Sequence, residues 1–481
     1  GGGRGGGGGG GRETEGRQQK DSGPPMAELK EKEEIAALLA SGNSAVVLAA
    51  GKARLFYEGN PVVYGGAVHA MLGKAASGDT VFVVDRQGKE VGWGVYNEDS
   101  MYRVRMLWLC AVDGPLPREP HMKSVLVERL RAARRVRAAL LLPRPGTDAY
   151  RLVNGEGDRL SGLVIDVYGS TAVLSASARW VEKYKEELLA AFDEAMEGTK
   201  IEVVWRQSVD RLRQDGLDIP TKAQLAKDAS EESGELEEDA EDDGGATKQG
   251  AEAAAAAAAT WDEDVVQVEE HGVKFAVAPK LGHKTGHYLD QRENRHRLGQ
   301  LCAGKEVLDT FCYSGGFSIN AALAGATRVD AVDSSAPALD LARRNALLNN
   351  VDTDNVLTLH RADVARFLSD SVAAGKQWDV VVLDPPKLAP SRKDLERARI
   401  KYKKLNKAGL QCVRSGGLLL SCTCSAAMAQ TGELLAVIRT AAAETGRQVT
   451  VVSVSGPGGD HPVSPSYQEG QYLTAYLIAV N

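Results

Sequence analysis

Two short segments near the carboxyl end of the chain carry the side chains best suited to covalent chemistry. The first is Ser421-Cys422-Thr423-Cys424-Ser425, which follows a run of leucines. A cysteine thiolate is a nucleophile that adds to electron-poor carbons, such as carbon 6 of a cytosine ring. That addition makes carbon 5, otherwise a poor nucleophile, able to take a methyl group. A free cysteine often only packs in the core, but the position of Cys424 after a predicted strand favours a nucleophile.

The second segment is Asp384-Pro385-Pro386-Lys387, which follows the apolar run Val380-Val381-Val382-Leu383. Two successive prolines fix the backbone and remove two N–H donors, so this turn can present its neighbours rigidly to a target group. A similar Asp/Asn-Pro-Pro turn in enzymes that methylate the amino groups of bases ends in an aromatic residue. Because Lys387 stands at that place, the turn points away from amino-group methylation.

Three predicted strands each end in an aspartate, namely Asp309, Asp333 and Asp384. Since ligands of open parallel sheets bind at the carboxyl ends of the strands, we expect these carboxylates to share one site. Each of them could instead cap a helix, but together with the glycine-bearing turn Thr310–Phe317 they favour a nucleoside ligand. Asp333 is placed to accept hydrogen bonds from ribose hydroxyls, and Asp363 is expected beside the adenine amino group.

The nature of that ligand follows from what surrounds the carboxylates. The dinucleotide fingerprint G-x-G-x-x-G is absent, which disfavours a ligand with a pyrophosphate. The glycines of the turn lack side chains, so a ligand can approach the backbone there. An adenosine ligand without phosphates fits best, and the sequence therefore predicts S-adenosylmethionine as the cofactor.

The elements that must position these residues alternate along the last third of the chain. Apolar runs at 306–309, 328–333, 380–384 and 417–421 are separated by helical spans. Continuous apolar strands with helices between them are typical of a parallel sheet covered on both faces. We therefore expect an α/β fold with a Rossmann-like domain at its C-terminal end.

The N-terminal half has a different pattern. Short alternating apolar runs between 46 and 109, separated by turns such as Gly59-Asn60-Pro61, predict a small β-barrel. An arginine-dense helix at 121–142 and a turn at Asn154-Gly155-Glu156-Gly157 follow, which indicates a second α/β unit. Residues 1–24 are rich in glycine and are expected to be disordered.

The net charge of −7 is unevenly distributed along the chain. The segment from Asp228 to Asp264 contains fourteen acidic residues and one lysine, a net of −13 that leaves +6 for the rest. This stretch, at about 217–262, is acidic and alanine-rich and is expected to be a disordered insertion. The folded parts are therefore mildly basic, which is compatible with a nucleic-acid partner.

Composition also bounds the location of the protein. No run of about 18 apolar residues is present, so we expect no membrane contact. The six cysteines have neither metal-ligand spacing nor a disulfide framework, so we expect no metal site and a reducing compartment. The chain does not begin with methionine, so a targeting peptide could have been removed, and the compartment stays open.

On these motifs, the chain resembles the bacterial large-subunit ribosomal RNA 5-methylcytosine methyltransferases, the RlmI-like family. The resemblance covers roughly Val46 to Asn481, apart from the acidic insertion. Further segments that carry it are Gly282-His283-Lys284-Thr285-Gly286-His287-Tyr288-Leu289-Asp290-Gln291-Arg292, Val332-Asp333-Ser334-Ser335, Asp460-His461-Pro462-Val463 and Tyr467-Gln468-Glu469-Gly470.

The resemblance implies a domain organisation and partners. After a tail and short helix at 1–45, it implies a PUA-like RNA-binding β-barrel at 46–112, a central α/β domain at 118–280 and a Rossmann-like class I methyltransferase domain at 281–481. It implies S-adenosylmethionine as cofactor and RNA, in particular ribosomal RNA, as partner. It places the protein in the cytoplasm, or in an organelle if a targeting peptide was removed, and it leaves monomer and homodimer open.

The resemblance also implies roles for individual residues. Cys424 would be the nucleophile toward cytosine, with Asp384 and Lys387 lining the base pocket. The segment Lys284–Arg292 would close over cofactor and substrate. The residues expected to bind the cofactor are Gln291, Arg292, Asp309, Phe311, Tyr313, Ser314, Gly315, Asp333, Ser334, Asp363 and Asp384.

One segment departs from the family pattern, and two other functions stay open. Gly59-Asn60-Pro61-Val62-Val63-Tyr64 lacks the basic residue, histidine and tryptophan that relatives carry around the proline, so RNA contact by the barrel is expected to be weaker or different. The first alternative function is an RNA base N-methyltransferase, for which Cys424 would be dispensable. The second is a catalytically silent RNA-binding factor of ribosome assembly.

Overall fold

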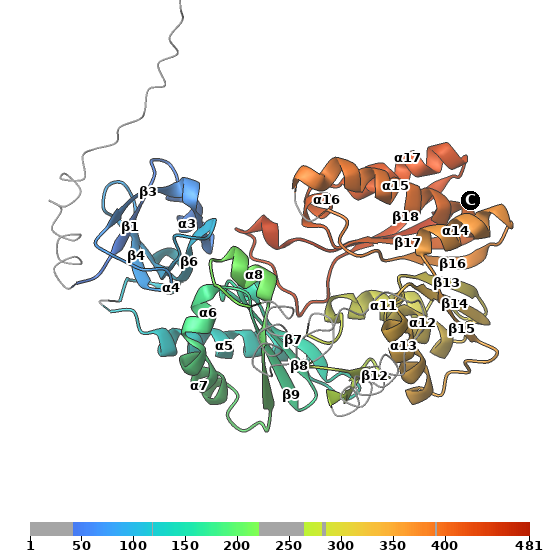
Figure 1. Ribbon diagram of the computed structural model, residues 1–481, viewed down its shortest axis with the longest axis horizontal. Helices are drawn as coiled ribbons and strands as arrows, with labels where there is room; N and C mark the ends of the chain where they lie inside the picture. Colours follow the sequence, from blue (N-terminus) through green and yellow to red (C-terminus); the bar gives the residue numbers. More distant parts are fainter. Residues whose placement is uncertain (1–41, 118, 221–263, 281–284, 390–391) are drawn as a thin grey trace, which may run out of the picture.

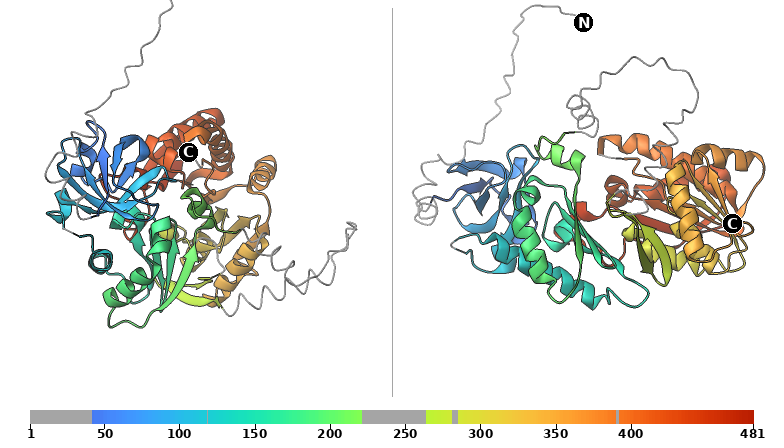
Figure 2. Two further views of the ribbon diagram at one scale, coloured as in Figure 1. Left: turned by 60° about the vertical axis from the view of Figure 1, so that its left-hand side comes forward. Right: turned by 60° about the horizontal axis from the view of Figure 1, so that its bottom comes forward.

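The computed structural model describes residues 42–117, 119–220, 264–280, 285–389 and 392–481. The glycine-rich tail, the helix expected near 26–39, residues 221–262 of the acidic insertion and Gly282 to Lys284 lie outside the described residues. Figure 1 shows an N-terminal β-barrel and a C-terminal body on opposite sides of a central body, and Figure 2 shows the same three bodies from two further directions. No helix in the described ranges is long and apolar enough to cross a membrane.

The N-terminal body is a strongly curved sheet of six short strands with the order β2-β6-β5-β4-β1-β3. Its alternating apolar side chains form a core of their own, which includes Val81, Val83 and Met106. This agrees with the small β-barrel predicted from the alternation. The elements are β1 (Ala45–Leu48), α3 (Arg54–Tyr57), β2 (Val62–Tyr64), η1 (Gly65–Ala67), β3 (Val68–Leu72), β4 (Thr80–Val84), β5 (Glu90–Tyr96), β6 (Tyr102–Leu109) and α4 (Cys110–Asp113).

The turn that departs from the family pattern holds this barrel against the C-terminal body. Asn60 Nδ2 donates a hydrogen bond to the carbonyl oxygen of Ser466 at 3.0 Å. Ser466 Oγ in turn donates to the carbonyl oxygen of Glu58. These bonds join residues about 400 positions apart, so the unusual Gly59-Asn60-Pro61 turn serves as an interdomain contact.

The central body is a four-stranded sheet with the order β10-β9-β8-β7, in which only β9 and β10 are parallel. Helix α5 packs on this sheet because its apolar residues recur every three or four positions, which places Leu126, Leu130 and Ala133 on one buried face. The elements are α5 (Met122–Ala139), β7 (Ala149–Asn154), η2 (Gly155–Asp158), β8 (Leu163–Tyr168), β9 (Thr171–Ala176), α6 (Arg179–Lys183), α7 (Lys185–Ala195), β10 (Glu202–Gln207) and α8 (Val209–Gln214).

Two arginines of α5 are buried rather than solvated. Arg129 pairs with Asp113 at 2.9 Å, and Arg137 forms a bidentate ion pair with Asp158. These guanidinium groups are used inside the fold, so a phosphate contact of this helix would have to come from its exposed arginines.

A β-hairpin joins the central and C-terminal bodies. It consists of the antiparallel strands β11 (Val266–Glu270) and β12 (Val273–Val277). Val268 and Phe275 of the hairpin share one hydrophobic core with Tyr168 of the central sheet and with Leu298 of the C-terminal body. The two bodies are therefore packed together through a continuous apolar core.

The C-terminal body is a seven-stranded sheet with the order β15-β14-β13-β16-β17-β19-β18 and helices on both faces (Figure 1). Strands β13 to β17 are parallel, as predicted, whereas β19 runs antiparallel to β17, and the edge strand β18, antiparallel to β19, runs again in the direction of the first five. Its elements are η3 (Leu289–Gln291), α11 (Arg292–Gly299), β13 (Glu306–Thr310), α12 (Gly316–Leu323), β14 (Arg328–Asp333), α13 (Ala336–Leu348), β15 (Leu357–Arg361), α14 (Val364–Ala373), β16 (Trp378–Leu383), η4 (Arg392–Asp394), α15 (Leu395–Cys412), β17 (Val413–Thr423), α16 (Ala426–Thr431), α17 (Glu433–Thr445), β18 (Val449–Ser455), η5 (Gln468–Gly470) and β19 (Thr474–Val480).

A buried carboxylate ties the C-terminal body to the central one. Asp460, which is 0% exposed, accepts hydrogen bonds from Arg292 Nη1 at 2.9 Å and Arg292 Nη2 at 3.0 Å. Its Oδ2 also accepts from the backbone N–H of Arg151 at 2.8 Å, and its carbonyl oxygen accepts from Arg137. The segment Asp460-His461-Pro462-Val463 is thus a joint between the two bodies.

Candidate active site

The strand ends of the C-terminal body bring the predicted site residues together. Asp309, Asp333 and Asp384 lie at or just after the carboxyl ends of β13, β14 and β16, and Cys424 follows β17. These four strands are neighbours in the sheet and run in the same direction. The strand order reverses between β13 and β16, which is where ligands of open α/β sheets bind.

Asp309 is the most buried of the three carboxylates, with 1% of its surface exposed. Its Oδ2 accepts from the backbone N–H and the hydroxyl of Ser318, at 3.0 and 2.6 Å, whereas Oδ1 has no hydrogen-bond partner among the described residues. The pKa of Asp309 is raised to about 7, mainly by burial and also by the charges of Asp384 and Asp333, while the hydrogen bonds from Ser318 oppose the rise. The Oδ1 atom of Asp309 is therefore suited to pair with a positively charged group of a ligand, and S-adenosylmethionine carries such groups.

The turn after β13 has an unusual backbone that Asp333 supports. Phe311, Tyr313 and Gly315 all have positive φ, at 59°, 48° and 77°. Asp333 accepts from the backbone N–H of Tyr313 at 3.0 Å and from that of Ser335 at 2.9 Å. Because left-handed backbone is costly for residues with a side chain, such a turn is typical of a ligand site.

Two serines beside this turn differ in their surroundings. Ser314 is buried, and its carbonyl oxygen accepts from Asn345 Nδ2 at 3.0 Å, so its place in the turn is fixed. Ser334 is exposed next to Asp333. Ser314 is therefore held in the turn, whereas the side chain of Ser334 is open to solvent.

Asp363 lies at the start of α14, where Oδ1 accepts from the backbone N–H of Arg366 at 2.9 Å. It thus caps the helix, which was the structural alternative to a role at the adenine. It also lines, together with Phe311 and Leu388, a cavity of about 640 Å³ between α14 and α15. That cavity offers room for a ring system beside the two predicted cofactor residues.

The structure separates the two cysteines of the motif. Cys422, on β17, is 0% exposed and lies in the hydrophobic core, and burial raises the pKa of its thiol well above the usual range. Cys424 is partly exposed, and its Sγ lies 3.9 Å from the carbonyl oxygen of Pro385. The thiol of Cys424 therefore stands beside the Asp384-Pro385-Pro386-Lys387 turn.

Lys387 is electrostatically coupled to both Cys424 and a residue of the central body. Burial lowers the pKa of the Lys387 ammonium, the positive charge of Arg211 lowers it further, and Cys424 opposes both effects. A cation beside a cysteine stabilises the thiolate relative to the thiol. Arg211 belongs to α8, so the central body contributes to the electrostatics of this site.

Two site residues were not singled out from the sequence. Tyr288, in the segment 285–292, packs edge-on against Tyr313 with ring centroids 5.1 Å apart. Burial raises the pKa of Tyr288 to about 12, and the charges of Asp290, Cys424 and Asp384 add to the shift. Its phenol is therefore a neutral hydrogen-bonding group near the strand ends. In the sequence, the only sign of a role for Tyr288 is its place in the segment Lys284–Arg292.

The second is Ser425, which holds the proline turn in place. Its Oγ accepts from the backbone N–H of Ala389 at 3.1 Å. Thr423 Oγ1 donates to the hydroxyl of Tyr402, which lies 3.5 Å from the same Oγ. This network joins the loops after β16 and β17, and long-range contacts of this kind leave no local signal in the sequence.

The structure does not bring Arg292 to the carboxylate cluster. Its guanidinium donates to Asp460, to the carbonyl oxygen of Ala149 and to Glu293, and it is 2% exposed. Gln291 is buried as well, and its Oε1 accepts from Asn294 Nδ2 at 2.7 Å. These contacts give Arg292 a structural role in the interdomain joint.

The domains of the chain match two family models. Residues 251–451 match an S-adenosylmethionine-dependent methyltransferase model, and residues 46–108 match a PUA-like domain model. Among solved structures, a candidate SAM-dependent methyltransferase from Streptococcus mutans has a TM-score of 0.68 and 18% identity, covering 90% of this chain and 99% of that one. A second candidate methyltransferase, complexed with SAH, has the same TM-score at 19% identity. These structures share the fold.

Curated relatives match over nearly the full chain. Ribosomal RNA large subunit methyltransferase I of Klebsiella pneumoniae (strain 342) is 32% identical over 435 residues, which is 90% of this chain and 98% of that protein. The enzyme of the same name from Escherichia coli O1:K1 is 32% identical over 436 residues, with coverage of 90% and 99%. The chain therefore belongs to the ribosomal RNA large subunit methyltransferase I family and is a methyltransferase with S-adenosylmethionine as its cofactor.

Proposed function

We propose that this protein methylates carbon 5 of cytosine in ribosomal RNA, with Cys424 as the nucleophile. The observation that carries the proposal is the contrast between the two cysteines after β17. Cys422 is buried in the core, whereas Cys424 is partly exposed beside the proline turn and Lys387. The names of the curated relatives support ribosomal RNA of the large subunit as the substrate.

The proposed reaction begins at Cys424. Its thiolate gives an electron pair to carbon 6 of the cytosine, and the π electrons of the C5=C6 bond make carbon 5 nucleophilic. S-adenosylmethionine supplies a methyl group on a positively charged sulfur. When bound, the cofactor would give that methyl group to carbon 5, and its sulfur would keep the electron pair of the broken S–C bond. The C5 proton then leaves to water, the C5=C6 bond forms again, and the C6–S electron pair returns to Cys424.

Other residues of this chain would prepare the reactants. Lys387 would stabilise the thiolate through its positive charge, since it is coupled to Cys424. Asp384 would accept a hydrogen bond from the exocyclic amino group of the cytosine and so orient the ring. Asp309, with its unpartnered Oδ1, would face a cationic group of the cofactor, and Asp333 and Asp363 would bind the ribose and the adenine.

The test is methyl transfer to ribosomal RNA that lacks modifications, followed by mass spectrometry of the nucleosides. The wild type should form 5-methylcytidine, and Cys424→Ala should lose at least about 10³-fold in rate, because removing a nucleophile abolishes the covalent route. Cys422→Ala is the matched control, two residues away and buried, and it should keep most of the activity of the wild type.

Two outcomes would contradict the proposal. Formation of an N-methylated base at an unchanged rate in Cys424→Ala would indicate amino-group methylation. Tight binding of S-adenosylmethionine and RNA without any methylated nucleoside would indicate a silent assembly factor.

A further inference from the structure

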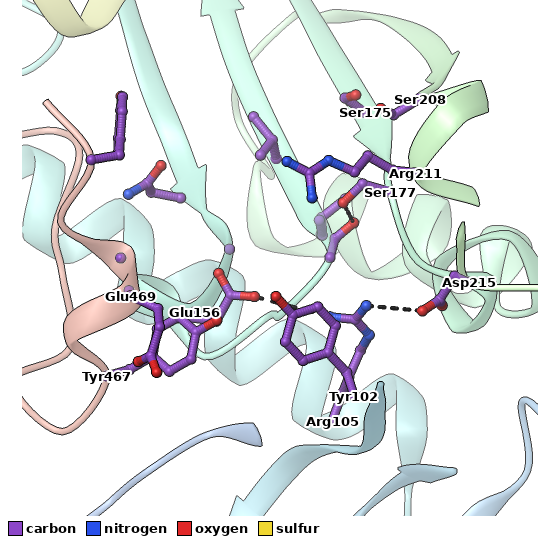
Figure 3. A pocket seen from close by; sticks show the side chains of 18 of the residues that line it. Tyr102, Arg105, Glu156, Ser175, Ser177, Ser208, Arg211, Asp215, Tyr467 and Glu469 are labelled. Carbon is purple, nitrogen blue, oxygen red and sulfur yellow. Dashed lines mark hydrogen bonds and ion pairs between the residues drawn. The ribbon is translucent and has the colours of Figure 1, made fainter. Parts of the chain in front are cut away.

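A large cavity lies outside the carboxylate cluster, where the three bodies of the protein meet. It has a volume of about 920 Å³, which is in the range of small-molecule and nucleotide sites. The barrel contributes Tyr102 and Arg105, the central body contributes Glu156 and Arg211, and the C-terminal body contributes the loop Pro462–Tyr472. Figure 3 shows these groups approaching the cavity from separate segments of the chain.

We propose that this cavity binds a guanosine of the same RNA strand, next to the target cytosine, and so selects the sequence around the methylated base. This inference uses one part of the proposed function, namely that the methylated base is a cytosine. It assigns Glu156 to the guanine edge, Tyr102 to the face of the base, and Arg211 to the phosphate between the two nucleotides.

Most charges of the cavity wall are already neutralised, and this isolates the groups left for a ligand. Arg105 donates to Asp215 at 3.1 Å and to Ser161 at 2.7 Å. Arg151 forms a bidentate ion pair with Asp166. The guanidinium of Arg211 has no hydrogen bond or ion pair with any residue in the described ranges, and its charge therefore remains available to a phosphate.

Arg211 also links this cavity to the site of methylation. It lines the cavity, and its positive charge acts on Lys387, which is coupled to Cys424. A cation shared by two neighbouring sites is well placed to bind the phosphate that joins two successive nucleotides. The cavity is thus an extension of the proposed active site along the RNA strand.

The carboxylate of Glu156 is positioned to accept hydrogen bonds from the edge of a base. Ser161 Oγ donates to its Oε1 at 2.7 Å and Arg105 Nη1 lies 4.0 Å from the same oxygen, which fixes the carboxylate, while Oε2 accepts no hydrogen bond from a described residue. Figure 3 shows this carboxylate between the barrel strand and the C-terminal loop. The Watson–Crick edge of guanine presents two adjacent donors, N1–H and the N2 amino group, to which a carboxylate can bind with both oxygens. Adenine, cytosine and uracil offer a single donor group on that edge.

Aromatic rings supply the surface on which a base can stack. Tyr102 lies on β6 beside Tyr64, with ring centroids 5.4 Å apart, and the guanidinium of Arg105 lies 4.7 Å from the centre of its ring. The hydroxyl groups of Tyr64 and Tyr467 are hydrogen-bonded to each other. Single-stranded RNA is commonly recognised by such stacking together with contacts to the base edge. The tyrosine cluster is held in place by its own contacts before any RNA binds.

The test uses the full chain and short single-stranded RNAs with one cytosine whose neighbours are G, A or U. Binding is measured by fluorescence anisotropy, so the result does not depend on methyl transfer. The wild type should bind the RNA with a neighbouring G about tenfold more tightly than the others, and Glu156→Gln should reduce that preference below about threefold. Arg211→Ala should weaken all RNAs about equally and make binding less dependent on salt. Controls are Glu202→Gln and Arg343→Ala, which are exposed outside this cavity and should bind as the wild type does.

A second measurement guards against misfolded variants. In the wild type, 4-thiouridine placed beside the cytosine should crosslink to peptides that contain Tyr102 or residues 462–472. Crosslinks confined to other surfaces, or an unchanged G preference in Glu156→Gln that still binds RNA, would overturn the inference. If a G preference is lost in Glu156→Gln but no cytosine is methylated by the wild type, the proposed function fails and the binding site stands.

Discussion

Replacing Asp460 by asparagine should strongly destabilise the protein, because it removes a charge from the joint between the central and C-terminal bodies. Asp460 and Arg292 are 0% and 2% exposed, so solvent does not screen their bidentate ion pair. Asparagine keeps one oxygen for the N–H of Arg151 but leaves the partly exposed Glu293, 3.2 Å from Arg292 Nε, as the remaining counter-charge of that guanidinium. Removing one partner of a buried pair costs about 3–5 kcal/mol, a large part of the stability of a typical protein.

Urea unfolding followed by circular dichroism measures this loss. With about 2–3 kcal/mol of stability lost per molar of urea, the midpoint should fall by about 1–2 M. The control is Glu444→Gln, whose ion pairs with Lys403 and Lys407 lie on the surface and should leave the midpoint unchanged. The double variant Asp460→Asn with Arg292→Met should recover part of the lost stability, because the buried positive charge of Arg292 is then removed together with its partner.

The pH dependence of this effect has a definite sign. Burial raises the pKa of Asp460, but His461 and Arg292 outweigh it and hold the pKa far below the usual range. The stabilisation is therefore fully present above the unfolded pKa of about 3.9 and is lost as the pH falls through the lower folded value. A midpoint for Asp460→Asn that lies less than about 0.3 M urea below that of the wild type, with both measured at the same pH between 5 and 8, would refute the role assigned to this ion pair.

Three further changes test the site and its supports. In Asp309→Asn, S-adenosylmethionine binding measured by calorimetry should be independent of pH, whereas the wild type should bind more tightly as the pH rises through about 7, where Asp309 ionises; equal pH profiles would contradict this. Gly157→Ala should lower the Tm markedly, since the new Cβ would lie 1.9 Å from the carbonyl oxygen of Pro462, and an unchanged Tm would exclude the contact. Ser425→Ala should cost about 1–3 kcal/mol and lower kcat more than it changes KM, because the N–H of Ala389 loses its acceptor; a change in KM alone would argue against a positioning role.

The meeting of the strand-end residues could be predicted because it follows from local pattern and general topology. Apolar runs that alternate with helices indicate parallel strands, and the carboxyl ends of such strands share one edge. Asp309, Asp333 and Asp384 were therefore expected together, and the mutual influence of their charges on the pKa of Asp309 is the physical result. Cys424 could be distinguished from Cys422 only by its position one residue beyond the strand.

Other features depend on contacts between distant segments and could not be predicted. Val449–Ser455 has the composition of a strand, but nothing in it indicates that β19 inserts between β17 and β18 and runs antiparallel to both. Arg292 stands in a motif expected at the cofactor, yet its partner Asp460 lies 168 positions away. The cavity around Glu156 and Arg211 arises only when three bodies come together.

The mechanism is tested most directly by a substrate that cannot complete it. RNA containing 5-fluorocytidine at the target position accepts the thiolate and the methyl group, but carbon 5 then carries fluorine in place of the proton that must leave. With S-adenosylmethionine present, the protein should form a stable covalent complex with this RNA, and mass spectrometry of the peptides should locate the bond at Sγ of Cys424. Formation of 5-methylcytidine in ordinary RNA without such a complex, or a complex at another cysteine, would contradict the assignment of Cys424 as the nucleophile.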